Sequence, residues 1–378
     1  MVSKIAFVTR NYIEPIIDGH IIISNRFIDY VLKDLGLEYV IVSFEESSLP
    51  NRYNPANKCV YVLPVLKHVY GYYGIGNYLK TVSLISKIIS REEASMVIIG
   101  SIPKELALPI KIMCRGTVAP YFFNSPVIFR YPPPLVDYRI RPLYWRLFSR
   151  FIGIGFSTSR ELSRYLNKLG LRTYWIPPVI PPIDSMFNKR GVRMELGLDV
   201  DSIVIGYMGH IDPYRGLPLL LKLVKPLRKH GIELTVFPTP TGFTMENKVL
   251  LDKLSREGAR IVYVDNVVKA YISSDIVILP FTKYYGYTSP PLTLLEALYY
   301  NGLVVSTRAS VTDEVSELGA RIFYLSSGRD PLGTILDIVE DLGSYTSVRE
   351  WNRSIVLRYF SPDSVRKIFS EIVEELGV

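Results

Sequence analysis

The segment Pro177-Pro-Val-Ile-Pro-Pro182 constrains the fold most, because it places four prolines within six residues between two long patterned stretches. Proline fixes its own backbone and restricts the residue before it, so this run continues neither a helix nor a strand. On each side, short apolar runs alternate with segments of helical period, which is typical of parallel, doubly wound sheets. The sequence therefore predicts an α/β protein of two Rossmann-like domains joined by a stiff connection.

The expected elements follow this alternation closely. In the first domain, strands are expected at Ile5–Thr9, Tyr39–Phe44, Val60–Val65, Met96–Gly100, Pro126–Tyr131, Ile152–Phe156 and Thr173–Ile176, and helices at Ser24–Leu35, Asn77–Ser90, Lys104–Cys114, Arg141–Arg150 and Ser159–Leu169. In the second, strands are expected at Ile203–Gly209, Glu233–Phe237, Arg260–Val264, Ile276–Pro280, Leu303–Ser306 and Arg321–Leu325, and helices at Leu217–His230, Met245–Glu257 and Pro362–Leu376. Folds of this kind bind nucleotides at the carboxyl ends of their strands, so we expect a ligand cleft between the domains.

Composition narrows the class of protein. The chain is 48% hydrophobic and 21% charged, which fits a globular enzyme. Residues 1–178 hold 22 Lys and Arg against 12 Asp and Glu, a net charge of +10, whereas residues 179–378 hold 22 against 24, a net charge of −2. The excess of positive charge in the first half predicts an anionic partner there. No apolar run approaches a membrane span, and the first residues enter a strand without a signal peptide, so we expect a cytoplasmic protein. The two cysteines and four scattered histidines predict neither a disulfide framework nor a metal site, and the lack of glutamine indicates a thermophilic source.

The stretch Tyr284–Gly302 follows the buried strand Asp275–Pro280 and combines a loop rich in tyrosine and glycine with a punctuated helix. We expect Ser289 at the N-cap, Pro290 in the first turn and Asn301-Gly302 at the C-terminal end. The residues expected to face the core are Leu292, Leu295, Leu298 and Tyr299.

Glu296 is the only ionisable residue of that helix. One interpretation is a solvated glutamate tolerated by the helix dipole. The other is a functional carboxylate on the same face as Ser289 and Thr293, where it accepts hydrogen bonds from a diol such as ribose. Because Pro290 and Pro291 have no N–H, the amides of Leu292 and Thr293 remain as donors for an anion at the helix start. Together these features favour a nucleotide diphosphate site.

Two glycine turns could add to this site. Gly206-Tyr-Met-Gly-His-Ile-Asp-Pro-Tyr-Arg-Gly216 follows the first strand of the second domain, and Arg215 at its end either is a surface side chain or presents its guanidinium to phosphate. Asp18-Gly19-His20 is a similar turn before a helix in the first domain. The Gly206–Gly216 turn has neither the dinucleotide nor the Walker spacing.

The residues described so far resemble those of a known family. Arg215-Gly216, the segment Val264-Asp-Asn-Val-Val-Lys-Ala-Tyr, and Pro291-Leu-Thr-Leu-Leu-Glu-Ala-Leu occur in an order and spacing similar to the C-terminal domain of family 4 glycosyltransferases of the GT-B fold. Ser157-Thr-Ser and the closing helix extend the resemblance to most of the chain. It implies domains over residues 1–178 and 179–360, with the helix at 361–378 returning to the first domain.

The resemblance assigns roles to individual residues. Arg215, Leu292, Thr293 and Gly19 would contact the donor diphosphate, Glu296 the ribose, and Asn266 and Val267 the base. His210 and Thr288 stand where the family has an arginine and the first motif glutamate, and they would act at the reacting centre. Arg130 and Tyr131 stand where a histidine is usual, and with His20 they would lie on the acceptor side.

The reaction implied is retaining transfer of a sugar from a nucleoside diphosphate sugar to a lipid-linked or oligosaccharide acceptor. It needs no metal or other cofactor, because fixed donors would stabilise the charge that develops on the distal phosphate. The segment Tyr138–Phe151 mixes arginines with aromatics. It is either an exposed helix whose aromatics face the core or an interfacial segment that contacts anionic headgroups at the cytoplasmic face of a membrane.

Three other functions remain open. A nucleotide-sugar 2-epimerase shares this fold, although we find no acidic and histidine groups to carry that reaction. A donor-binding relative without turnover would fit Thr288 and the missing histidine. A nucleic-acid binder fits only the basic first half, and since no recognition module appears, we expect no nucleic-acid partner.

Overall fold

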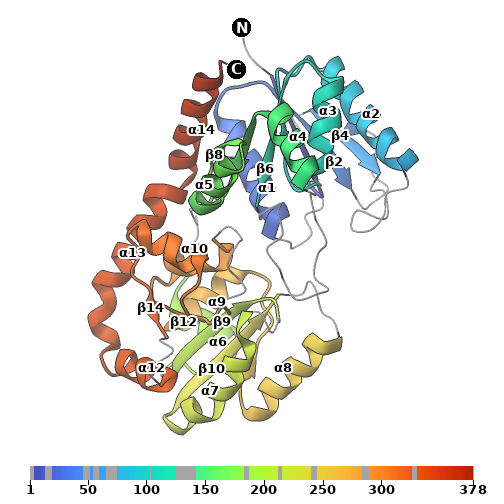
Figure 1. Cartoon of the computed structure of the whole chain (residues 1–378). Coiled ribbons are helices and arrows are strands. Elements are labelled where there is room, and N and C mark those ends of the chain that lie inside the picture. The colour runs from blue at the N-terminus through green and yellow to red at the C-terminus, as the bar shows by residue number, and fades with distance from the viewer. Residues whose placement is uncertain are drawn as a thin grey trace. The chain divides into compact units, whose positions relative to one another are not determined.

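The structure is a computed structural model that describes residues 4–12, 19–45, 52–53, 59–64, 75–102, 104–123, 142–182, 187–211, 215–239, 245–282, 290–325 and 330–377. The chain divides into two compact units (Figure 1). Unit 1 comprises Met1–Pro181 together with Pro362–Val378, and unit 2 comprises Pro182–Ser361. The sequence-based division fell after residue 178 and after residue 360.

Among the described residues, unit 1 contains an eight-stranded sheet in the order β3-β4-β2-β1-β5-β6-β7-β8. Every neighbouring pair is parallel except β3 with β4 at one edge. The strands are β1 (Ile5–Arg10), β2 (Tyr39–Glu45), β3 (Arg52–Tyr53), β4 (Cys59–Pro64), β5 (Met96–Ile99), β6 (Thr117–Phe122), β7 (Ile154–Ser157) and β8 (Arg172–Trp175). The central strand β1 is apolar and fully buried from Ile5 to Val8, as expected for a strand covered on both faces.

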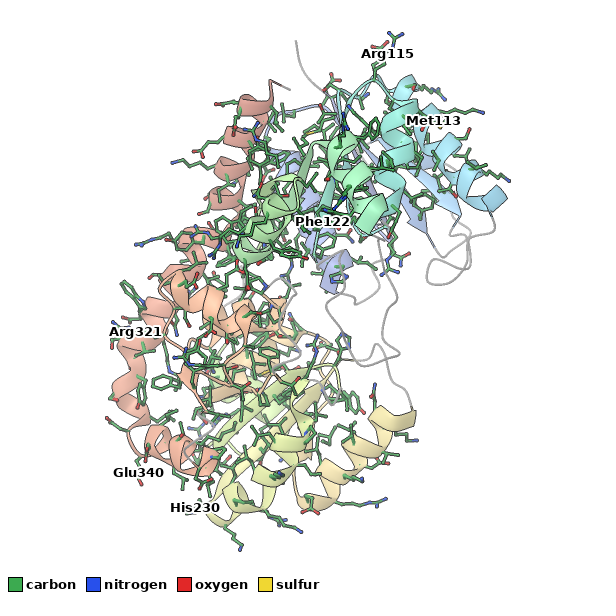
Figure 2. The ribbon with its side chains drawn as sticks, viewed as in Figure 1. Met113, Arg115, Phe122, His230, Arg321 and Glu340 are labelled. Carbon is green, nitrogen blue, oxygen red and sulfur yellow. The ribbon has the colours of Figure 1, made fainter. Side chains whose placement is uncertain are left out.

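Helices cover this sheet. They are α1 (Gly19–Tyr30), η1 (Leu32–Asp34), α2 (Ile75–Arg91), η2 (Lys104–Leu106), α3 (Ala107–Met113), α4 (Pro142–Ile152), α5 (Arg160–Lys168) and α14 (Pro362–Leu376). Figure 2 shows Phe122 in the interior of unit 1, with Met113 and Arg115 on its outside. Ser159 caps α5 by accepting the Leu162 amide at 3.1 Å, so the predicted start of that helix is confirmed.

The closing helix α14 belongs to unit 1, and its bounds are those predicted. Its apolar stripe is buried: Phe369 contacts Phe27 and Phe156 edge-on, with ring centroids 5.0 and 6.0 Å apart. Arg366 also binds Asp34 at 2.7 Å, and Figure 1 shows the helix beside β8 and α5. The expectation that this stripe needs a surface to cover is therefore confirmed.

Unit 1 differs from the sequence prediction in several places, and the two-residue edge strand β3 is one element that was not predicted. Gly19 and His20 are the first residues of α1, so the expected turn at these positions and a helix start at Ser24 are wrong. The strand β6 at Thr117–Phe122 was not predicted, because its Ala-Pro-Tyr sequence lacks the branched apolar run of the other strands. The strand expected at Pro126–Tyr131 lies outside the described residues.

Unit 2 contains a six-stranded parallel sheet among its described residues, in the order β11-β10-β9-β12-β13-β14. The strands are β9 (Ile203–Gly209), β10 (Ile232–Pro238), β11 (Arg260–Ile261), β12 (Ile276–Leu279), β13 (Val304–Ser306) and β14 (Phe323–Tyr324). The helices are α6 (Lys189–Glu195), α7 (Leu217–Lys229), α8 (Met245–Glu257), α9 (Val267–Ser273), α10 (Leu292–Tyr300), α11 (Ser310–Glu317), α12 (Pro331–Glu340), η4 (Leu342–Tyr345) and α13 (Thr346–Phe360). All six strands were predicted, whereas α6, α9, α11, α12 and α13 were not. Among the described residues, no helix is long and apolar enough to span a bilayer.

Candidate functional site

The helix α10 starts at Leu292 with Pro291 at its N-cap, two residues later than predicted. Pro291 occupies the N-cap position in extended conformation (φ −62°, ψ 140°), and its carbonyl accepts the Leu294 and Leu295 amides at 2.9 and 3.2 Å. The expected cap at Ser289 and first turn at Pro290 are therefore wrong, because a residue that precedes proline is held out of the helical region. Ser289 itself lies outside the described residues.

Despite the later start, the donors at the end of the helix are the two that the sequence predicts. The carbonyl of Pro291 takes the Leu294 and Leu295 amides, so the Leu292 and Thr293 amides are the leading N–H groups. The Thr293 hydroxyl oxygen is buried and has no hydrogen-bond partner in the described part of the chain. Leu292 is half-buried, so its expected place in the core is also wrong.

Gly209 lies close to both the start of α10 and the Arg215 side chain. A methyl group on the Gly209 Cα would lie 3.0 Å from Arg215 Nη1 and 3.8 Å from Thr293 Cγ2. Both side chains therefore border the end of β9, at the carboxyl edge of the sheet where such folds bind ligands. The structure thus brings together two of the three residues expected to hold phosphate in this domain.

Gly216 explains how Arg215 reaches that position. Its φ of +81° favours glycine, and a Cβ at this position would lie 1.6 Å from the Pro280 carbonyl oxygen. The turn before α7 therefore passes directly against the end of β12. Any larger residue would force the Arg215 segment away from the strand ends.

Glu296 lies one turn further along α10 and is 5% exposed. One of its oxygens, Oε2, accepts the Tyr271 hydroxyl at 3.0 Å. The interpretation of a solvated surface glutamate is therefore wrong, because this carboxylate is buried and hydrogen-bonded.

Tyr271 belongs to α9, the helix that begins with the residues expected to flank a base. Asn266 caps this helix by accepting the Val268 amide at 3.0 Å, and Val267 is its first residue. The contact between Tyr271 and Glu296 therefore links the expected ribose and base positions. Tyr271 was not predicted as a site residue, because its contact with Glu296 depends on how α9 packs against α10.

His210 follows Gly209 at the end of β9. Its Nδ1 lies 3.1 Å from Thr239 Oγ1, and its carbonyl accepts the Tyr207 hydroxyl at 2.7 Å. The residue is half-buried and is held from both sides, so its ring has a fixed position next to the turn that carries Arg215.

The other predicted site residues do not lie next to Arg215 and Thr293 among the described residues of unit 2. Gly19 and His20 lie in unit 1, where the His20 ring stacks on Phe123 with centroids 5.3 Å apart. Thr288, Arg130 and Tyr131 lie outside the described residues.

Near His20, unit 1 has a basic group that the sequence analysis missed. The Lys104 ammonium donates to the Ile99 carbonyl at 3.1 Å and lies 4.8 Å from the Phe123 ring centroid. Burial lowers the pKa of Lys104 to about 7; the Glu105 carboxylate opposes this shift and the Arg10 guanidinium adds to it. Arg10 and Ile99 end two adjacent parallel strands, so these groups lie at the carboxyl edge of the first sheet.

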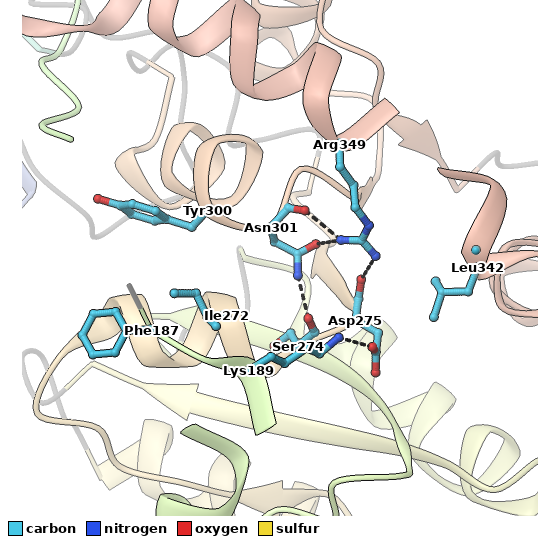
Figure 3. Close-up of a pocket in the computed structure, with 10 residues that line it drawn as sticks. Phe187, Lys189, Ile272, Ser274, Asp275, Tyr300, Asn301, Leu342 and Arg349 are labelled. Carbon is cyan, nitrogen blue, oxygen red and sulfur yellow. Dashed lines mark hydrogen bonds and ion pairs between the residues drawn. The ribbon is translucent and has the colours of Figure 1, made fainter. Parts of the chain in front are cut away.

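A pocket of about 470 Å³ lies at the opposite, amino edge of the unit 2 sheet, next to Asp275 (Figure 3). Asp275 precedes β12, binds Lys189 through Oδ1, and accepts Arg193 at 2.6 Å and the Val204 amide at 2.7 Å through Oδ2. Arg349 of α13 donates to the Asp275 carbonyl at 2.6 Å and to the Asn301 side chain at 2.8 Å.

These bonds tie α6, α13 and the end of α10 to the sheet. Burial lowers the pKa of Lys189 and of Arg349. Burial pulls the pKa of Asp275 upward, but the hydrogen bonds from Lys189 and the Val204 amide outweigh it and the pKa is lowered. The pocket is therefore lined by a structural ion-pair network, at the opposite edge of the sheet from Arg215.

Among the described residues, no group of three or more His, Cys, Asp or Glu side chains could hold a metal ion.

Comparison with known proteins shows which fold the chain has. No family model and no curated protein matches the chain. Among solved structures, it is similar to sucrose-phosphate synthase from Thermosynechococcus elongatus (TM-score 0.74, 13% identity, 99% of each chain covered). It is also similar to a glycosyltransferase from Rickettsia africae (0.73, 12%, covering 99% of this chain and 98% of that one). A third is Anabaena HepE in complex with UDP-glucose (0.71, 13%, covering 98% of this chain and 99% of that one).

Identities this low show the fold. The predicted fold class is confirmed: this is an α/β chain with two Rossmann-like units, each built on a mainly parallel sheet, and it has the GT-B fold of these glycosyltransferases.

Proposed function

We propose that this protein is a glycosyltransferase that binds a nucleoside diphosphate sugar in unit 2 and transfers the sugar with retention, without a metal. The observation that carries the proposal is the position of Arg215 and Thr293 next to Gly209, at the carboxyl edge of the sheet. A guanidinium and the exposed amides of a helix start are suited to bind a diphosphate. The fold shared with the UDP-glucose complex of HepE supports the same ligand class.

The parts of the donor have separate partners in this proposal. The distal phosphate is bound by the Leu292 and Thr293 amides and by Arg215, and the buried Thr293 hydroxyl gains a partner there. The ribose hydroxyls donate hydrogen bonds to the Glu296 carboxylate, which also accepts the Tyr271 hydroxyl. The base lies at the start of α9 beside Asn266 and Val267.

During transfer, negative charge grows on the oxygen that leaves the sugar. Donors that are already fixed stabilise this charge without reorganisation, which is the electrostatic role that a metal has in other enzymes. Arg215 supplies a permanent cation, and His210 at the adjacent strand end adds a titratable one. Thr288, which replaces the family's glutamate, would face the sugar.

We propose that the acceptor binds unit 1 at the carboxyl edge of its sheet, near His20, and that it also contacts Arg130 and Tyr131, which lie outside the described residues. Arg10 supplies positive charge at that edge, and Lys104, whose pKa is lowered to about 7, is partly protonated at neutral pH; both suit an acceptor that carries an anionic group such as a lipid-linked phosphate. The protein would act in glycan biosynthesis in the cytoplasm, on the cytoplasmic face of the membrane.

The decisive experiment is thermal unfolding with UDP-, GDP- and ADP-sugars, because a ligand that binds the folded state raises Tm. We expect one base to raise Tm without added metal and in the presence of a chelator. Arg215→Met should weaken that nucleotide sugar about ten-fold or more, as expected for loss of a charge-assisted hydrogen bond. Lys222→Met, an exposed cation on the adjacent helix α7, is the matched control and should leave binding unchanged.

Product analysis then separates the reactions open to this fold. Transfer to an acceptor with the anomeric configuration kept supports the proposal. An epimer formed from the nucleotide sugar alone indicates a 2-epimerase, and binding without any product indicates a relative without turnover. If no nucleotide sugar changes Tm, or if Arg215→Met and Lys222→Met behave alike, the proposed donor site is wrong.

A further inference from the structure

The helices α2, α3 and α4 form one continuous side of unit 1, because α3 packs against both of the others (Figure 1). Their solvent-facing side is called the outer face here. Its exposed apolar side chains are Leu79 and Leu84 of α2, Ile112 and Met113 of α3, and Leu147 and Phe151 of α4. Several are widely exposed, with Ile112 at 74% and Phe151 at 56%.

Exposed large apolar side chains are concentrated on the outer face. The described residues contain twelve exposed large apolar side chains, and six of them lie on these three helices. Single exposed apolar residues are normal on any protein, but a group of them gathered on three neighbouring helices indicates a surface that another molecule covers.

The charge of the outer face is equally one-sided. None of the three helices contains an aspartate or a glutamate. Their cations are Lys80, Lys87, Arg91, Lys111, Arg146 and Arg150. Two acidic residues follow α2: Glu92 is bound by Lys4 at 2.6 Å and by the Tyr61 hydroxyl, and Glu93 is exposed at the end of the helix.

Other helices of unit 1 differ in this respect. The closing helix α14 carries Asp363, Glu371, Glu374 and Glu375, and α5 carries Glu161. The absence of carboxylates from α2, α3 and α4 is therefore local to this side of the unit.

We propose that the outer face docks onto an anionic lipid bilayer. Exposed apolar side chains enter the interfacial layer while lysines and arginines contact lipid phosphates, and both kinds of side chain alternate here: Arg146 and Arg150 flank Leu147 and Phe151 on α4. Trp145 does not take part, because it is buried and donates to the Leu169 carbonyl at 3.1 Å. The expectation that the α4 aromatics face the core therefore holds for Trp145 and Phe148, and Phe151 faces solvent.

Two other occupants fit less well. A nucleic acid would pair with the cations but would leave six apolar side chains without a partner. A second copy of this chain, joined by a two-fold contact, would place six cations against six identical cations. An anionic bilayer is complementary to both features at once.

This inference rests on the proposed function only in giving the docking a purpose, since a bilayer brings a lipid-linked acceptor to unit 1. The surface itself is independent of donor binding, so the two ideas fail separately. Loss of vesicle binding with nucleotide-sugar binding intact would refute the docking alone, and the reverse result would refute the proposed donor site alone.

The test is co-sedimentation with phosphatidylcholine vesicles that contain either no anionic lipid or about one third phosphatidylglycerol. We expect binding to the anionic vesicles only, and weaker binding at about 1 M salt because charges are then screened. The double variant Arg146→Gln/Arg150→Gln should bind about 30-fold more weakly, at roughly five-fold per cation. Leu147→Ser/Phe151→Ser should weaken binding about ten-fold or more.

Matched controls come from unit 2. Met194→Ser/Val249→Ser removes two apolar side chains of similar exposure, and Lys248→Gln/Lys253→Gln removes two exposed cations from α8. Both should bind vesicles as the parent does, and all variants should keep its Tm. The proposal is overturned if anionic vesicles leave the protein in the supernatant or if controls and outer-face variants lose binding equally. It is also overturned if the outer-face variants instead abolish duplex DNA binding or dissociate a dimer.

Discussion

Replacing Gly209 with alanine tests the candidate donor site directly, because a methyl group there enters the space between Arg215 and the start of α10. The backbone of Gly209 has φ +131°, a conformation that residues with a side chain rarely adopt. The new methyl would lie 3.0 Å from Arg215 Nη1, closer than ordinary contact, and 3.8 Å from Thr293 Cγ2. The substitution therefore combines backbone strain with displacement of the guanidinium.

The two effects appear in different measurements. Holding alanine in a sparsely populated backbone region costs on the order of 1–3 kcal/mol of the free energy of unfolding. The guanidinium is the end of a flexible side chain and can move away, so its displacement costs little stability. It removes a charge-assisted hydrogen bond to the ligand, worth about 1.5–3 kcal/mol, which corresponds to a loss of nucleotide-sugar affinity of roughly ten-fold or more.

Two other glycines of unit 2 supply the controls. Gly231 has φ +70° but nothing within 4 Å of an added methyl, so Gly231→Ala imposes strain alone. Gly191, inside α6, has neither a positive φ nor a close neighbour, so Gly191→Ala should leave stability unchanged or raise it by up to about 1 kcal/mol. Urea unfolding and calorimetric titration measure the two quantities. If Gly209→Ala binds the nucleotide sugar as tightly as Gly231→Ala does, the phosphate does not lie between Arg215 and Thr293.

Three further predictions follow from buried polar groups. Thr293→Val should unfold at slightly higher urea, because a buried hydroxyl without a partner is removed, yet should bind the nucleotide sugar several-fold more weakly in the same titration. Asp275→Asn should lower the free energy of unfolding by about 3 kcal/mol, because Arg193 is 4% exposed and loses its counter-ion. The pKa of Asp275 is lowered in the folded protein, so the carboxylate stabilises the fold at pH values above its unfolded-state pKa near 3.8, and this stabilisation is lost as the pH falls below that value. Urea unfolding at pH 3 and pH 6 would detect the difference. The pKa of Lys104 is lowered from 10.5 to about 7, so between these pH values the unfolded chain binds more protons than the folded chain. The free energy of unfolding should therefore rise by roughly 1 kcal/mol per pH unit from pH 7 to 10. Urea unfolding at pH 7 and pH 9 should show this rise in the parent protein and not in Lys104→Met.

Much of the fold was predictable because hydrophobic period and punctuation agree along most of the chain. All six strands of unit 2 and the closing helix α14 were found in this way, since each is an apolar run or stripe bounded by proline, glycine or a cap. The strand β6 was missed because Thr117–Phe122 contains proline and alanine and takes its strand conformation from its neighbours β5 and β7. Short helices such as α9 were missed because seven residues carry little periodic signal.

The site was predictable to the extent that it depends on the backbone. Arg215 and Thr293 could be anticipated, because a strand end, a glycine turn and a helix start place them whatever the packing around them. The start of α10 was misplaced because two consecutive prolines restrict each other, which outweighed the capping preference of serine. The partner of Glu296 depends on how α9 packs against α10, and the burial of Lys104 depends on Phe123 and Ile99, so neither follows from local sequence.

The proposed sites explain why positive charge is concentrated in the first half of the chain. The proposed donor site holds a diphosphate with backbone amides and one guanidinium, so the half of the chain that carries it, 22 Lys and Arg against 24 Asp and Glu, needs no excess of positive charge. The excess in the first half, 22 against 12, is what we expect if a second anionic partner binds there. Six of those cations lie on α2, α3 and α4 among exposed apolar side chains, and Arg10 and Lys104 lie at the strand ends where the acceptor is proposed to bind. A lipid-linked phosphate at the surface of an anionic bilayer would satisfy both groups of cations, whereas a neutral soluble sugar would satisfy neither.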